Sequence, residues 1–72
     1  MQPQEAKKLQ KRLRREILRA DQLAWWSDEQ KADKSLDMQI RRDAEQRAVL
    51  AIATRRELQG VLEDLEEAMS DA

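Results

Sequence analysis

The apolar residues of this chain recur three or four positions apart, and this spacing predicts two amphipathic helices. The first stripe predicts a helix over residues 4–26, and Pro3 suits its first turn. The members of this stripe are Ala6, Leu9, Leu13, Ile17, Ala20 and Ala24. A second stripe predicts a longer helix over residues 36–70. Its members are Leu36, Ile40, Ala44, Ala51, Leu58, Leu62, Leu65 and Met69.

The polar segment 27–35 separates the two stripes and predicts a turn. Ser27 followed by Gln30 has the pattern of a capping box, and Asp33 or Ser35 could instead cap the second helix. The fold class is therefore all-α, a helical hairpin of two antiparallel helices in a single domain. One continuous helix stays an alternative, because heptad-like spacing runs through the turn at Leu18, Trp25, Ala32 and Leu36.

Charge is distributed unevenly along the chain. Residues 1–19 carry seven basic and two acidic side chains, a net charge of +5, whereas residues 57–72 carry six acidic side chains and no base. Each end opposes the dipole of its own helix. Antiparallel packing would place the basic first helix beside the acidic end of the second, which favours a hairpin or an antiparallel dimer.

Several apolar residues lie off the main stripe and predict more than two helices in the finished assembly. Ala48–Ala53 is apolar on every side, and the longer second helix should overhang the first by roughly 15–18 Å. We therefore predict a homodimer that forms a four-helix bundle or an antiparallel coiled coil. Gly60 is expected where another backbone comes close. The predicted oligomer core is Val49, Ile52, Ala53, Leu58, Leu62, Leu65 and Met69.

Trp25 and Trp26 are the only aromatic residues. Adjacent helical residues point about 100° apart, so we expect one ring to be buried and the other at least partly exposed. Together with Leu18 they are the candidate partner-binding residues, because tryptophan is enriched in binding hot spots. Alternatively, both rings only close the end of the bundle near the turn.

The basic side chains of the first helix are candidates for contact with nucleic-acid phosphates. They are Lys7, Lys8, Lys11, Arg12, Arg14, Arg15 and Arg19. A net charge of −1, an isoelectric point near 5.4 and the lack of a recognised nucleic-acid motif make this the second hypothesis.

The composition argues against catalysis. The chain has no Cys, His or Tyr, so it lacks disulfides, the usual transition-metal ligands and the common bases for a serine nucleophile. The acidic run around Glu63 and Asp64 is typical of a solvated face. We expect no cofactor, metal or small-molecule substrate. With no signal peptide and no membrane-spanning apolar run, we expect a cytoplasmic protein.

These observations predict a small non-enzymatic regulator or adaptor that binds itself and another protein. The basic first helix, the acidic second helix and the aspartate-containing turn are similar to the coiled-coil hairpins of bacterial transcription factors that enter the RNA polymerase secondary channel, the DksA-like group. This resemblance implies RNA polymerase as an alternative partner. The chain lacks the zinc-finger cysteines of that group, and no residue role carries over.

Overall fold

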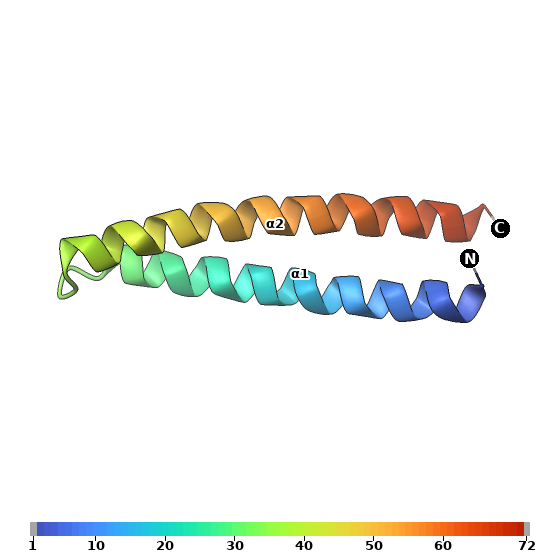
Figure 1. Cartoon of the computed structure of the whole chain (residues 1–72), viewed down its shortest axis with the longest axis horizontal. Helices are drawn as coiled ribbons and strands as arrows, with labels where there is room; N and C mark the ends of the chain where they lie inside the picture. Colours follow the sequence, from blue (N-terminus) through green and yellow to red (C-terminus); the bar gives the residue numbers. More distant parts are fainter. Residues whose placement is uncertain (1, 72) are drawn as a thin grey trace.

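Two long antiparallel helices pack side by side in the computed structural model, which describes residues 2–71 (Figure 1). Helix α1 spans Pro3–Ala32 and helix α2 spans Met38–Ser70. The hairpin measures 53 × 15 × 12 Å, and the start of α1 lies beside the end of α2. The all-α hairpin is thus confirmed over the described residues, and the continuous-helix alternative is wrong. Dimerisation remains a prediction.

The turn is shorter than expected and begins later in the chain. Helix α1 continues to Ala32, so the segment 27–32 is helical and only residues 33–37 connect the helices. Ser27 is fully buried within α1, and the predicted capping box does not form. The segment lacks Gly and Pro, and its small Ser27 continues the seven-residue spacing of Ala6, Leu13 and Ala20 into the helix contact.

The two helices are nearly equal, with 30 and 33 residues. The expected overhang of α2 is therefore wrong, because the residues assigned to the turn lengthen α1 instead. At the end of the hairpin away from the turn, which we call the open end, both helices reach about the same position along the long axis (Figure 1). The apolar residues near the end of α2 therefore lie beside α1.

Aspartate side chains organise the turn. The Asp33 carboxylate accepts hydrogen bonds from the backbone N–H of Ser35 at 3.0 Å and from its hydroxyl at 2.6 Å. These bonds, more than the nearby Arg41 guanidinium, lower the pKa of Asp33 from its ordinary value. Asp37 caps α2 by accepting a hydrogen bond from the backbone N–H of Gln39 at 3.0 Å. Of the expected caps, Asp33 instead closes the end of α1.

Small side chains fill the contact between the helices. The buried apolar residues of the described chain are six alanines and Leu13, and Ser27 is the buried polar residue. Near the turn, Ala20, Ala24 and Ser27 of α1 share this contact with alanines of α2. Small residues allow helix axes to approach closely, because little volume separates the two backbones. The hairpin core is consequently thin.

Two arginines that interrupt the apolar stripe of α2 join the helices. Arg55 forms an ion pair with Asp21 of α1. Arg47 donates a hydrogen bond to the side chain of Gln30 at 2.9 Å, and its guanidinium lies 5.6 Å from the ring centre of Trp26. Both side chains lie at the edge of the line of contact between the two helices, which we call the seam, and both are long enough to reach across it.

Candidate interaction surfaces

The large apolar side chains of this protein lie mostly on its outside. Those that remain at least two-fifths exposed are Leu18, Leu23, Trp25, Trp26, Met38, Ile40, Val49, Leu50 and Val61. Scattered exposed leucines are normal in soluble proteins, but here the alanines are inside and the larger residues outside. This inverted distribution leaves extended apolar surface on the outside of the single hairpin.

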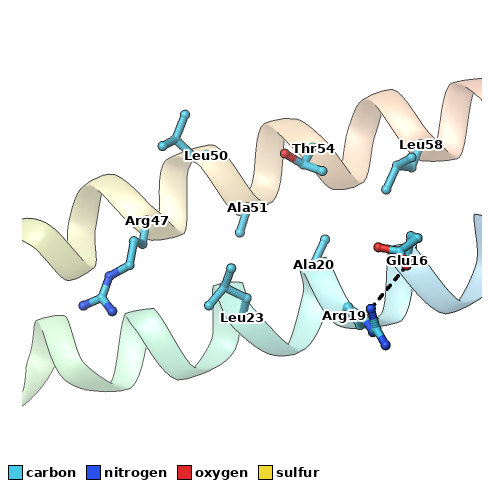
Figure 2. A pocket seen from close by; sticks show the side chains of 9 residues that line it. All are labelled: Glu16, Arg19, Ala20, Leu23, Arg47, Leu50, Ala51, Thr54 and Leu58. Atoms are coloured by element: carbon cyan, nitrogen blue, oxygen red, sulfur yellow. Dashed lines mark hydrogen bonds and ion pairs between the residues drawn. The ribbon is translucent and has the colours of Figure 1, made fainter.

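One side of the hairpin carries an open groove of about 340 Å³ between the helices (Figure 2). Ala20 and Leu23 of α1 and Arg47 and Ala51 of α2 are among the residues that line it. Residues seven positions apart share one side of a coiled-coil helix, so this side extends beyond the groove. We call it the groove face. From α1 it comprises Leu9, Arg12, Glu16, Arg19, Leu23 and Trp26. From α2 it comprises Ile40, Arg47, Leu50, Thr54, Glu57, Val61 and Asp64.

We call the opposite side of the hairpin the rear face, and two ion pairs between the helices border it. They join Asp21 with Arg55 and Lys31 with Glu45, the latter at 3.7 Å. Its apolar residues are confined to the middle of the hairpin. The rear face comprises Arg14, Leu18, Asp21 and Trp25 of α1, and Glu45, Val49, Ile52 and Arg56 of α2.

The adjacent tryptophans belong to different faces. Trp26 lies on the groove face near Arg47, and Trp25 lies with Leu18 on the rear face. The expectation that one ring is buried is wrong for the single chain, since Trp25 is 67% and Trp26 48% exposed. The cause is the narrow contact between the helices. It accommodates the small side chains of Ala24 and Ser27, which flank the two tryptophans in the sequence, but it has no room for an indole ring.

The predicted oligomer-core residues divide into two groups. Leu58, Leu62, Leu65 and Met69 are half-buried and continue the spacing of the buried alanines, so they pack in the seam of the hairpin itself. Val49 and Ala53 are exposed, and Ile52 is half-buried. Leu23 lies outside the two predicted stripes, and Leu50 and Val61 lie only at the edge of the second stripe. Seven-residue spacing from Leu9 and from Thr54 is the signal that would have found Leu23 and Val61.

Gly60 does not lie against another part of its own chain. A methyl group added at this position would meet no heavy atom within 4 Å in the part of the chain that the structure describes. The expected close backbone approach is therefore absent from the hairpin. Within the single chain, the glycine only lowers the helix propensity of α2.

The basic side chains of the early part of α1 all point to solvent. Over residues 2–71, Arg19 is their one member in an ion pair, with Glu16 of the same helix at 3.4 Å. The acidic residues at the end of α2 lie alongside at the same end of the hairpin (Figure 1), without an ion pair to these bases among the described residues. The open end therefore has one basic helix and one acidic helix, each with charges available to other molecules.

No group of three or more carboxylates could hold a metal ion within residues 2–71. In the same range, neither helix is long and apolar enough to cross a membrane. Comparisons with protein-family models, curated proteins and solved structures found no match.

Proposed function

We propose that this protein is a small non-enzymatic adaptor or regulator that acts by stoichiometric protein–protein contact as a self-associating helical bundle. The observation that carries the proposal is the inverted distribution of side-chain size. Alanines fill the helix contact, while both tryptophans and several leucines lie outside it. A hairpin with this distribution buries little apolar area by itself and gains stability by covering its faces.

The accessible surface supports this proposal quantitatively. A compact monomer of 8.5 kDa exposes about 4,700 Å², whereas the hairpin exposes 5943 Å². The excess is roughly 1,200 Å² per chain, which corresponds to an interface in the range of obligate homodimers when two chains contribute it. The radius of gyration, 16.2 Å, also exceeds the value of about 11 Å for a compact domain of this length.

Sedimentation velocity across a wide concentration range tests self-association directly. We expect a dimer at micromolar concentration, and a monomer throughout would contradict the proposal. The adaptor role is tested by affinity capture from the native host, with a Trp25→Ala variant as the control. A genuine partner of the rear face should be lost from the variant, while the helicity of the variant is unchanged.

A second candidate function, contact with nucleic acid, is favoured by the solvent-exposed bases of α1. Six of the seven have no ion-pair partner in the described chain, so their charges are free to meet phosphates. A gel-shift titration at low salt tests this function. Retardation that weakens steeply with added salt would support it, and the absence of any shift at low salt would exclude it.

A further inference from the structure

The groove face is the more complete apolar surface of the two. Its central line carries Leu9 and Leu23 on α1 and Ile40 and Val61 on α2, spread along most of the hairpin. The charged residues on that line already have partners in the chain, since Glu16 accepts from Arg19 and Arg47 donates to Gln30. Covering this face would therefore bury apolar groups without leaving these charges unpaired.

The ion pairs between the helices show which residues of α1 and α2 lie at the same level, meaning at the same position along the long axis of the hairpin. Asp21 lies opposite Arg55, and Lys31 lies opposite Glu45. Counting from these pairs in the antiparallel direction, Trp26 is level with Leu50, Arg19 with Glu57, and Arg12 with Asp64. All six residues occupy the outer edges of the groove face, one edge on each helix.

The two members of each pair lie on opposite outer edges of the groove face, so the width of the hairpin separates them within one chain. Neither Arg12 nor Arg19 forms an ion pair with an acid of α2 in the described chain. Each pair is nevertheless complementary, since one joins two apolar residues and the other two join opposite charges. The two edges of the groove face therefore match each other, and only a second molecule can bring them together.

We propose that a second copy of this chain covers the groove face, related by a two-fold axis that runs parallel to the helices. Each α1 then lies on α2 of the other copy, with Trp26 against Leu50, Arg19 against Glu57 and Arg12 against Asp64. All neighbouring helices in the resulting four-helix bundle are antiparallel. Both turns lie at the same end of the bundle.

The other two-fold arrangement places the turns at opposite ends and lays each α1 on the α1 of the second copy. In that arrangement the basic start of α1 faces the end of another α1, and the acidic end of α2 faces the start of another α2. Arg12 then lies near the level of Leu23, and the charges of opposite sign no longer meet. Complementary charges across an interface select orientation, so they favour the arrangement with both turns together.

This inference rests on the self-association proposed above and adds a division of labour between the faces. The groove face is covered in the dimer, whereas the rear face with Leu18, Trp25 and Val49 stays exposed to other proteins. A different protein would bind there, once on each side of the symmetric bundle. The two adjacent tryptophans therefore serve two different contacts.

Pulsed electron spin resonance distances between labelled turns test the arrangement. The chain has no cysteine, so a Lys34→Cys variant carries a single spin label in the turn of each copy. With both turns together we expect a label-to-label distance of about 15–30 Å, because neighbouring helix axes lie 8–10 Å apart. Turns at opposite ends of a bundle 53 Å long would give roughly 50 Å and overturn the inference while leaving the dimer intact. A monomer would overturn both proposals.

Reversing the matched charges gives a second, independent test. One variant carries Arg12→Glu and Arg19→Glu, and another carries Glu57→Arg and Asp64→Arg. Each variant alone should dimerise on the order of tenfold more weakly, and a mixture of the two should recover the affinity as a heterodimer.

Lys8→Glu with Arg15→Glu is the matched control, because it reverses two bases of α1 that lie outside the groove face. This control should change the dimer affinity less than the groove-face variants do. A mixture of the two groove-face variants that dimerises no better than either alone would contradict the proposed pairing.

Discussion

The adjacent tryptophans allow a sharp comparison, because two identical side chains occupy neighbouring positions on different faces. Trp26 is 48% exposed, which leaves about 100 Å² of a large aromatic side chain for a partner to cover. At about 25 cal/mol per Å², covering that area contributes about 2.5 kcal/mol per ring. The symmetric dimer buries two such rings. Allowing for incomplete coverage, Trp26→Ala should weaken dimerisation by about 4 kcal/mol, roughly a thousandfold in the dissociation constant.

Trp25→Ala is the matched control, since Trp25 is the more exposed ring at 67% and lies on the rear face. We expect this variant to change the dimer dissociation constant by less than about threefold, which is within the range of ordinary surface substitutions. Sedimentation equilibrium measures both constants, and circular dichroism checks that both variants remain helical. An argument from exposed area alone would give the opposite ranking, with Trp25 the more important.

Fluorescence separates the two sites without removing bulk. A Trp25→Phe variant retains Trp26 as the single fluorophore, and its emission should shift to shorter wavelength as the concentration rises through the dimerisation range. The reciprocal Trp26→Phe variant should show little shift. The assignment of faces would be refuted if Trp25→Ala weakened the dimer as much as Trp26→Ala, or if the blue shift followed Trp25.

Four further changes probe the hairpin. Gly60→Ala should raise the free energy of unfolding by about 1 kcal/mol, because the added methyl meets open space; thermal melting that shows a lower stability would reveal a backbone of another chain at this site. Ser27→Ala should stabilise by about 1 kcal/mol, since the buried hydroxyl has no hydrogen-bond partner within residues 2–71, and urea unfolding measures the change. Ala48→Leu should destabilise by about 1–3 kcal/mol in the same assay, because the closely packed seam has no room for it. Asp33→Asn should remove a pH dependence: the lowered folded pKa of Asp33 stabilises the protein above the unfolded pKa of about 3.9, and this contribution is lost as pH falls through the folded value. Melting curves of Asp33→Asn and the parent protein should therefore differ at neutral pH and converge in acid.

The position of the turn shows how helix propensity and tertiary contact combine. The segment 27–32 is polar, and polarity alone predicted a loop there. Its residues are nevertheless compatible with a helix, and Ser27 is small enough to enter the seam. The helix therefore ends only where Asp33 binds Ser35 and starts again where Asp37 caps α2. Local hydrogen bonds of two aspartates mark the ends of the helices better than the change in polarity did.

The opposite charges at the start of α1 and the end of α2 affect assembly more than they affect the stability of the single hairpin. The bases of α1 and the acids of α2 lie side by side along the open end, yet no ion pair connects them in the described chain. Exposed pairs of this kind contribute little to stability, about 0–1 kcal/mol each. Their value lies in selecting which helices meet, and the proposed bundle surrounds each basic segment with acidic segments on two sides.

The amino-acid sequence by itself determined that this chain is helical and that it folds back on itself. Apolar spacing of three and four residues, the absence of Gly and Pro from most of the chain and the opposite charges of its two ends were sufficient for that prediction. The same spacing also predicted the buried side of the first helix, since Ala6, Leu13, Ala20 and Ala24 of its stripe are buried. Only the tertiary structure decided that mostly alanines occupy the contact while both tryptophans stay exposed. Alanines occupy the contact because small side chains let the backbones approach, and Leu23, Trp26 and Leu50 therefore lie outside it. Periodicity locates an apolar stripe, but the competition between close backbone approach and side-chain volume decides which part of that stripe faces the neighbouring helix.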